Sequence, residues 1–319
     1  MSISSLMPPL VTLLGVVLAL VLTLGQGHCD AADRRLHVVA TTTVVADLVR
    51  QIAGDRVGVD CLMAAGIDPH SYKATPRDAD RLARADLVVA SGLHLEGKLA
   101  DLLERLSRRV PVISVADAIP ADRLLDAGAG LHDPHVWFDA ELWSLGVPAV
   151  AERLAQLDPP HAEAYREAGR AYAERLIALD GELRESLAEI PLERRVMVTA
   201  HDAFRYFGRA YGIEVVGIQG TSTEAEAGLG DINRLVDLVV TRRLPAVFVE
   251  TSVSDRNVTA LREGARARGH TVGLGGRLYS DSLDAPGKGA GTLEEALRAN
   301  VATIVSALAK PQPAPSGSK

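Results

Sequence analysis

The sequence predicts an α/β fold with two lobes, each built on a mainly parallel β-sheet flanked by helices, and one long rigid helix that joins the lobes. Three observations favour this class. Short apolar runs alternate with helical patterns in the first half of the chain, and the same alternation restarts at residue 195. Between the two halves lies one helical pattern that is too long for a single small lobe. Strands that alternate with helices at this spacing are typical of βαβ units and therefore of parallel sheets.

The first half of the chain predicts four strands and the helices between them. Leu87 to Ala90 is a short apolar run of the kind found in buried parallel strands. Thr75 can cap a helix that has Pro76 in its first turn. Asp139 can cap a later helix, in which Pro148 predicts a kink or a break into two helices. The predicted strands are 36–41, 57–63, 87–90 and 110–115, and the predicted helices are 44–53, one from residue 76, 95–106 and 140–157.

The long helical pattern runs from His161 to Leu187 and is rich in Ala, Glu, Arg and Leu. About 27 residues at 1.5 Å each give a helix of roughly 40 Å, which suits a connection that spans two lobes. We therefore expect a first lobe at 34–158, a linking helix at 159–190 and a second lobe at 191–309. The predicted strands of the second lobe are 195–200, 214–218, 246–250 and 271–274, and its predicted helices are 203–211, 231–242, 257–268 and 293–308.

The two ends of the chain are expected to lie outside the fold. Residues 7–24 are almost entirely apolar and no charged side chain precedes Asp30, so residues 1–33 are interpreted as a signal or export segment. Cleavage, lipidation at Cys29 and retention as an anchor all stay open. Export places the protein in the periplasm or on the outer face of the cytoplasmic membrane. Residues 310–319 are rich in Pro and Ser and are expected to form a disordered tail.

Composition excludes several classes of partner and site. Aromatic residues make up only 4% of the chain, so the core must be built from Ala, Val, Leu and Ile. A formal net charge of −7 argues against nucleic acid or an anionic membrane surface as the main partner. The two cysteines, Cys29 and Cys61, exclude a disulfide-dense scaffold and multi-cysteine metal sites. A disulfide between them is not expected, because Cys29 lies at the edge of the export segment.

Three of the nine histidines lie where a ligand site is expected. His70 and His135 each follow an Asp-Pro pair, in which proline stiffens the loop. His201 and Asp281 each follow a predicted strand. Ligands of open α/β sheets bind beyond the carboxyl ends of strands, so a cleft between the lobes can collect these side chains around one cation. Spacing alone leaves a metal site and scattered structural histidines equally open. The remaining histidines are interpreted as structural or as neighbours of the site: His28, His37, His94, His132, His161 and His270.

Four ordered segments carry a resemblance to a known family. They are Gly66–Tyr72 (GIDPHSY), Asp133–Trp137 (DPHVW), Thr199–Phe204 (TAHDAF) and Leu278–Leu283 (LYSDSL). From about residue 36 to 309 the chain resembles the zinc/manganese class of solute-binding proteins of bacterial ABC importers. The resemblance implies two α/β lobes joined by a single rigid helix. It also transfers the role of metal ligand to four residues: His70, His135, His201 and Asp281.

Two departures from the family pattern bear on the choice of metal. Zinc-specific members often carry a histidine-rich loop before the second ligand, whereas residues 120–131 contain no histidine. Many manganese-type members have Glu at the third ligand position, where this chain has His201. Glu250 matches a family position near the cleft, and we expect it at most to support a ligand.

The four candidate ligands predict capture of a metal ion. Three neutral imidazoles and a carboxylate suit Zn²⁺, Mn²⁺ or Fe²⁺, and the affinity should fall as pH drops through the histidine range. We expect the ion to be cargo, captured by a monomer and delivered to the permease of an ABC importer. Two alternatives are an exported metallohydrolase, with Asp202 or Glu250 as the base, and a surface adhesin with a structural metal.

Overall fold

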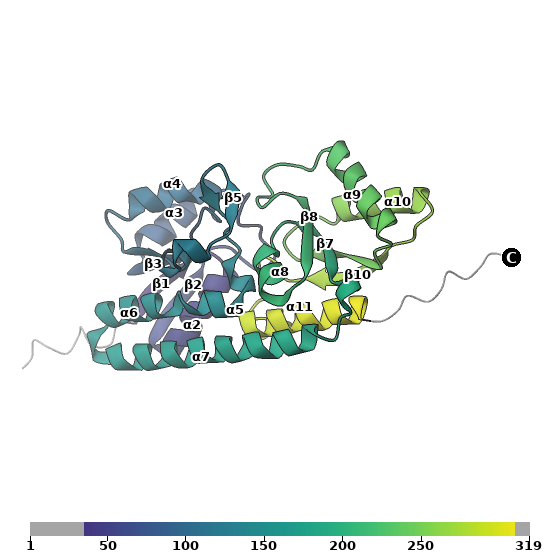
Figure 1. The fold of residues 1–319 in the computed structure, drawn as a ribbon. Helices are drawn as coiled ribbons and strands as arrows, with labels where there is room; N and C mark the ends of the chain where they lie inside the picture. Colours follow the sequence, from purple (N-terminus) through teal and green to yellow (C-terminus); the bar gives the residue numbers. More distant parts are fainter. Residues whose placement is uncertain (1–34, 310–319) are drawn as a thin grey trace, which may run out of the picture. The chain divides into compact units, whose positions relative to one another are not determined.

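The computed structural model describes residues 35–309 (Figure 1). The first sheet of this part has four parallel strands in the order β2-β1-β3-β4. These strands are β1 (Leu36–Ala40), β2 (Val57–Cys61), β3 (Leu87–Ala90) and β4 (Val112–Ser114). The parallel pairing confirms the predicted class of the first lobe. The predicted export segment, Cys29 and the predicted tail at 310–319 lie outside the described residues.

The first helices begin where the sequence places capping residues. Helix α2 (Thr43–Ala53) begins after Thr42, whose side chain accepts a hydrogen bond from the backbone N–H of Val45. Helix α3 (Pro76–Ala83) has the predicted cap at Thr75, and the side chains of Thr75 and Asp78 form a reciprocal capping box. Local chemistry therefore decides both starts.

Two predicted helices differ from the structure. The helix expected at 95–106 is a 3₁₀ turn (Gly97–Leu99) followed by the short helix α4 (Ala100–Leu106). Leu93 and His94 have φ angles of 52° and 62°, so the chain makes a left-handed turn before the helix instead of entering it directly. The helix expected at 140–157 is broken into α5 (Ala140–Ser144) and α6 (Val147–Leu157). Pro148 lies in the first turn of α6, which is the break that the proline allowed.

A short antiparallel hairpin precedes the second Asp-Pro-His segment and was not predicted. It consists of β5 (Asp126–Gly128) and β6 (Leu131–His132). Its turn needs left-handed backbone at Gly128, Ala129 and Gly130. The hairpin is largely exposed, so the sequence lacks the apolar alternation that would reveal it.

The second lobe contains two parallel strand pairs that lie side by side. Strand β7 (Val196–His201) pairs with β8 (Glu214–Gln219), and β9 (Ala246–Glu250) pairs with β10 (Gly273–Leu278). Strands β7 and β9 are neighbours. The expected strand at 271–274 was placed too early, because three glycines between 273 and 276 hide the apolar pattern and the ladder is irregular there. The helices of this lobe are α8 (Arg205–Tyr211), α9 (Leu229–Thr241), α10 (Arg256–Ala267) and α11 (Leu293–Leu308).

Helix α7 (Ala162–Leu187) connects the two groups of strands, as predicted. Its 26 residues extend about 39 Å. It packs against α2, α5 and α6 of the first lobe and against α8 and α11 of the second (Figure 1). No helix among residues 35–309 is long and apolar enough to cross a membrane.

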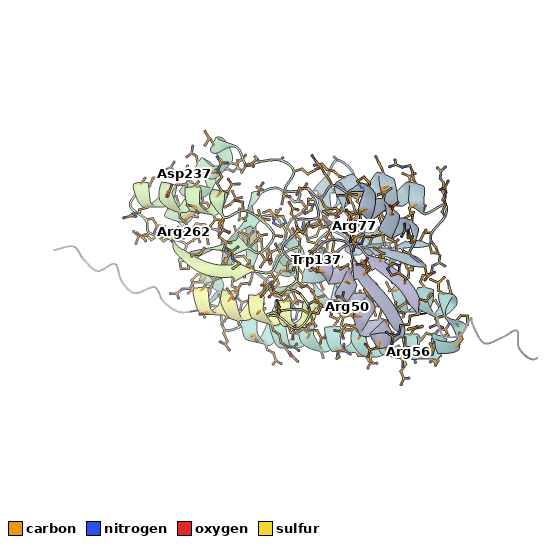
Figure 2. The ribbon with its side chains drawn as sticks, turned by 180° about the vertical axis from the view of Figure 1, so that it is seen from behind. Arg50, Arg56, Arg77, Trp137, Asp237 and Arg262 are labelled. Atoms are coloured by element: carbon orange, nitrogen blue, oxygen red, sulfur yellow. The ribbon has the colours of Figure 1, made fainter. Side chains whose placement is uncertain are left out.

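One apolar core extends across both lobes. It includes Val38 and Leu48 from the first lobe and Met197, Phe248 and Ile304 from the second. Trp137 also belongs to it and lies between the labelled residues of the two lobes in Figure 2. The domain boundaries predicted from the sequence stay predictions, but the shared core already shows that the lobes are not packed independently.

Candidate metal centre

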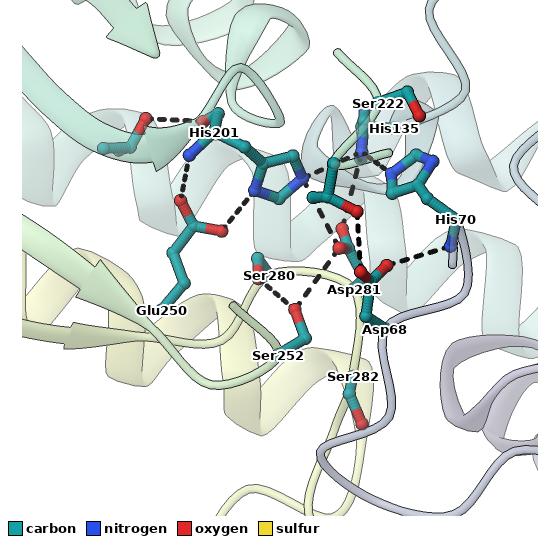
Figure 3. A network of polar contacts seen from close by, with 12 residues as sticks. Asp68, His70, His135, His201, Ser222, Glu250, Ser252, Ser280, Asp281 and Ser282 are labelled. Carbon is teal, nitrogen blue, oxygen red and sulfur yellow. Dashed lines mark hydrogen bonds and ion pairs between the residues drawn. The ribbon is translucent and has the colours of Figure 1, made fainter. Parts of the chain in front are cut away.

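The four predicted ligands come together in one buried cluster. His70 lies on the loop between β2 and α3, and His135 precedes a 3₁₀ turn (Val136–Phe138). His201 is the last residue of β7, and Asp281 follows β10. One ligand atom from each residue lies within 4.8 Å of the others, and all four residues are buried (Figure 3). Among the described residues this is the one group of three or more metal-ligating side chains that could hold an ion.

The distances within the cluster fit a small divalent ion. Nε2 of His135 lies 3.2 Å from Nε2 of His70 and 3.3 Å from Nε2 of His201. The two carboxylate oxygens of Asp281 lie 3.4 Å from Nε2 of His135 and 3.4 Å from Nε2 of His201. Metal–nitrogen bonds of about 2.0–2.1 Å in a tetrahedral site place ligand atoms roughly 3.3 Å apart. The side chains are therefore already spaced as ligands.

Two further carboxylates fix the orientation of two imidazoles. Nδ1 of His135 lies 2.8 Å from Oδ1 of Asp133, and Nδ1 of His201 lies 2.5 Å from Oε2 of Glu250. In a neutral imidazole Nδ1 then carries the hydrogen and donates it, which leaves a lone pair on Nε2. Both lone pairs point into the cluster, where they repel each other unless a cation or proton lies between them.

Asp281 supplies an unsatisfied anionic oxygen to the same point. Its Oδ1 is buried and accepts no hydrogen bond from any described residue. The other oxygen accepts a hydrogen bond of 3.3 Å from the hydroxyl of Ser252. A buried carboxylate oxygen without a donor is costly, so the donor set of this cluster fits a metal ion.

Burial and charge move the pKa values of the cluster in opposite directions. Burial lowers the pKa of His70 to about 4. Burial also acts to lower the pKa of His201, but the charges of Glu250 and Asp281 outweigh it and raise the pKa well above its usual value. Burial acts to raise the pKa of Asp281, but His201 and His135 hold it well below its usual value. The cluster thus keeps an ionised carboxylate beside nitrogens that attract a positive charge.

The aspartates of the two Asp-Pro-His segments have a role that the sequence analysis missed. The backbone N–H of His70 donates to Oδ1 of Asp68 at 2.9 Å, and that of His135 donates to Oδ1 of Asp133 at 3.0 Å. Each is an aspartate turn closed two residues later. Proline is therefore not the only residue that stiffens these loops, and the aspartate repeated in both segments is the sequence signal for the turn.

Glu250 and Trp137 support ligands from outside the cluster. Glu250 accepts from the backbone N–H of His201 at 2.9 Å as well as from its ring, so the expectation that it supports a ligand agrees with the geometry. The indole N–H of Trp137 donates to the carbonyl of Ser280 at 3.2 Å, which ties the loop of His135 to the loop of Asp281. This contact joins residues 143 positions apart, and no local pattern could have indicated it.

The other described histidines lie apart from the cluster. His132 is in β6 and, with His94, lines a separate cavity of about 450 Å³ at the ends of β3 and β4. His161 contacts Asp158 on the surface, and His270 contacts the carbonyl of Leu244. Their interpretation as residues outside the site therefore agrees with the structure.

Comparisons with known proteins give a consistent result along the whole described chain. The family model described as zinc-uptake complex component A, periplasmic (ZnuA), matches residues 38–307. The manganese-binding lipoprotein MntA of Bacillus subtilis is 46% identical over 279 residues, which cover 87% of this chain and 91% of the relative. The zinc-binding protein TroA of Treponema pallidum is 43% identical over 299 residues, which cover 92% of this chain and 97% of the relative.

Solved structures share the fold. The periplasmic zinc-binding protein TroA from Treponema pallidum superposes with a TM-score of 0.85 at 43% identity, covering 87% of this chain and 100% of that chain. A Mn-bound periplasmic metal-binding protein from Candidatus Liberibacter asiaticus superposes with a TM-score of 0.74 at 25% identity, covering 86% of this chain and 99% of that chain.

Proposed function

Because this chain belongs to the zinc-uptake complex component A family, we propose that it captures a divalent transition-metal ion outside the cytoplasm and delivers it to the permease of an ABC importer. The ion is the cargo, and the chain acts as an exported monomer. The relatives named above are a manganese-binding lipoprotein and a zinc-binding protein, which is the class of cargo that we assign here.

One observation carries this proposal: the lone pairs of three imidazoles and one carboxylate converge in a single buried cluster. His70, His135 and His201 would each bind the ion through Nε2, and Asp281 would bind it through its carboxylate. The hydrogen bonds that Nδ1–H of His135 and His201 donates to Asp133 and Glu250 fix the tautomers that leave Nε2 free to bind the ion. Such a site is built to hold an ion.

The arrangement favours binding over catalysis. Catalytic zinc sites usually have three protein ligands and keep a fourth position for water, whereas this cluster offers four side chains. Glu250, one of the two candidate bases, is occupied by His201. The other, Asp202, lies 3.7 Å from the guanidinium of Arg205. Neither the metallohydrolase nor the adhesin alternative gains support from these contacts.

The donor set is compatible with zinc and with manganese. Sites of nitrogen and oxygen donors bind Zn²⁺ more tightly than Mn²⁺ by intrinsic affinity, and Fe²⁺ lies between them. Both oxygens of Asp281 face the cluster, so a five-coordinate ion would also be accommodated. We therefore propose that the cargo in the cell depends on which of these metals is available.

Metal content of the purified full chain tests the proposal. After loading with excess Zn²⁺ or Mn²⁺ and gel filtration, elemental analysis should find about one ion per chain. The double variant His135→Ala, Asp281→Ala should lose this ion while its circular dichroism stays native. His132→Ala is the matched control, since this histidine is three residues before His135 in the sequence but does not belong to the cluster.

Two results would overturn this assignment. One is a wild-type chain that holds no stoichiometric metal in either loading. The other is a folded double variant that keeps as much metal as the His132→Ala control. Hydrolysis of an ester, phosphate or peptide substrate that disappears with the ligands would favour the metallohydrolase instead.

A further inference from the structure

The two Asp-Pro-His segments use their aspartates differently. Asp133 accepts the backbone N–H of His135, which closes its turn, and it also accepts the ring Nδ1–H of the same histidine. Asp68 closes the equivalent turn, but among the described residues no hydrogen bond to the ring Nδ1 of His70 is found. His70 is therefore the one histidine of the cluster whose ring orientation is not fixed by a carboxylate.

The free oxygen of Asp68 reaches the second lobe instead. Its Oδ2 accepts a hydrogen bond of 2.9 Å from the hydroxyl of Ser71 and one of 2.6 Å from the hydroxyl of Thr223. Thr223 lies on the connection between β8 and α9 (residues 220–228), which we call the 220–228 loop. Figure 3 shows Asp68 beside His70, with its bond to the backbone nitrogen of that residue. A side chain of the second lobe thus closes onto the turn that presents His70.

The other ligands are held more firmly than His70. The hydroxyl of Tyr206 in the second lobe donates to the carbonyl of Asp133 at 2.9 Å, and Trp137 ties the same segment to Ser280. Residues 64–67 of the His70 loop are exposed. Besides the bond from Thr223, this loop is joined to the second lobe by a hydrogen bond of 2.8 Å from the Gly66 N–H to the hydroxyl of Ser282. The loop of His70 is therefore the part of the site that can move at the lowest cost.

We propose that Thr223 is a positioning residue, which holds His70 in the metal site through Asp68. The hydrogen bond from Thr223 to Asp68 must break before the ion leaves. This inference rests on the proposed function. It assigns ion release to separation of the His70 loop from the 220–228 loop. A rotation of the lobes about α7 is not needed.

The neighbouring ion pair cannot replace the hydroxyl. Nζ of Lys98 lies 2.7 Å from Glu224, the residue next to Thr223, but both side chains are about two-fifths exposed. Exposed ion pairs of this kind add little. The bond from Thr223 ends on a carboxylate, and charge-assisted bonds are the stronger class. Its loss should therefore appear mainly in the rate at which the ion dissociates.

Chelator-driven release of Zn²⁺, followed by stopped flow, tests this role. Thr223→Val keeps the shape of the side chain and removes the donor, so release should be about 10-fold faster than from the wild type. Thr223→Ser keeps the hydroxyl and should restore the slow rate. Thr221→Val is the matched control on the same loop, because Thr221 is half-buried like Thr223 but makes no hydrogen bond to any described residue of the first lobe.

A purely structural effect is separated by a second readout. The metal-free protein should keep the wild-type unfolding midpoint in Thr223→Ser and Thr221→Val. In Thr223→Val the midpoint should fall only by the small amount expected for one lost hydrogen bond, with the protein still folded. The inference is overturned if Thr223→Val releases Zn²⁺ at the wild-type rate, or if Thr221→Val accelerates release equally. A wild-type chain that binds no Zn²⁺ would overturn the proposed function and this inference together, whereas tight binding with no effect of Thr223→Val would overturn the inference alone.

Discussion

Glu250 controls which nitrogen of His201 faces the metal site. Its two oxygens accept from the backbone N–H and from the ring Nδ1 of His201, and the side chain is completely buried. Because both oxygens of Glu250 are used by donors of the same histidine, the ring of His201 is held in one orientation. The carboxylate therefore sets the tautomer and orientation of one ligand.

Glu250→Gln should lower metal affinity about 10- to 100-fold. Glutamine has a single acceptor oxygen, so its NH₂ group must face one of the two donors of His201. If the NH₂ faces Nδ1, it favours the tautomer with the hydrogen on Nε2, which cannot bind a metal. Competition titration with a chelator of known affinity measures the loss.

Asp202→Asn provides the control for this prediction. Asp202 follows His201 directly, and Asp202→Asn removes one negative charge, as Glu250→Gln does. Among residues 35–309, however, the side chain of Asp202 makes no hydrogen bond to the ring of a metal ligand. We expect a loss several-fold smaller than for Glu250→Gln. Equal losses in both variants would mean that nearby negative charge, and not the tautomer, sets the affinity.

At the level of single residues the sequence predicted the ligands better than their supports. His70, His135, His201 and Asp281 each follow a strand or a proline-stiffened turn, which is a local pattern. The contacts of Glu250 and Trp137 join residues 49 and 143 positions apart and depend on the packing of the lobes. Such contacts leave no trace in local spacing, so only the resemblance pointed to Glu250.

Among the elements, α7 has two glycines with opposite surroundings. A Cβ added at Gly169 would lie 2.8 Å from the Cβ of Ala151 on α6, which is too close without movement. A Cβ added at Gly181 would meet nothing within 4 Å. Gly169 thus permits the close approach of two helices, whereas Gly181 only weakens the helix.

Substitution of these two glycines by alanine should therefore have opposite effects on stability. Gly181→Ala should raise the free energy of unfolding by about 0.5–1 kcal/mol, because alanine is the better helix former. Gly169→Ala gains the same propensity but overpacks the contact with α6, at a cost of about 1–3 kcal/mol, so a net loss is expected. Urea unfolding of both variants gives the comparison. A gain at both positions would show that α6 and α7 can separate freely.

Elements were predicted well where local chemistry decides them. Thr75 begins α3 and the predicted bounds of α11 match the structure, because capping residues and apolar periodicity act within a few positions. The strand β10 was predicted too early in the chain, and the turn at Leu93 and His94 was not predicted. Three glycines mask β10, and left-handed backbone at non-glycine residues is stabilised only by its surroundings.

At the scale of the whole molecule, the strands of the second lobe couple two cores. Along β7, Val196 and Val198 belong to a core found only in the second lobe, whereas Met197 between them belongs to the core shared by both lobes. In β9, Val247 belongs to the core of the second lobe and Phe248 to the shared core. Alternate side chains of a strand point to opposite faces, so β7 and β9 each pack in both cores at once. A strand that leaves one core must also leave the other.

The two lobes are also joined directly by aromatic packing. The ring of Phe138 from the first lobe lies 4.3 Å from the ring of Phe204 in the second, measured between centroids, and both residues are buried. Together with α7 this contact opposes a wide hinge motion, which agrees with the proposal that release begins at the His70 loop. The described chain should therefore unfold as one cooperative unit.

Leu261→Ala tests this cooperativity. Leu261 is fully buried in the core of the second lobe, and its truncation should cost about 2–5 kcal/mol. Both tryptophans, Trp137 and Trp143, lie in the shared core. If the lobes unfold together, tryptophan fluorescence and far-ultraviolet circular dichroism should shift to the same lower urea midpoint. Leu229→Ala, at a leucine that is 82% exposed in the same lobe, should leave both midpoints unchanged. A fluorescence midpoint that stays at the wild-type value in Leu261→Ala would show that the shared core survives loss of the second, and that the lobes are separable.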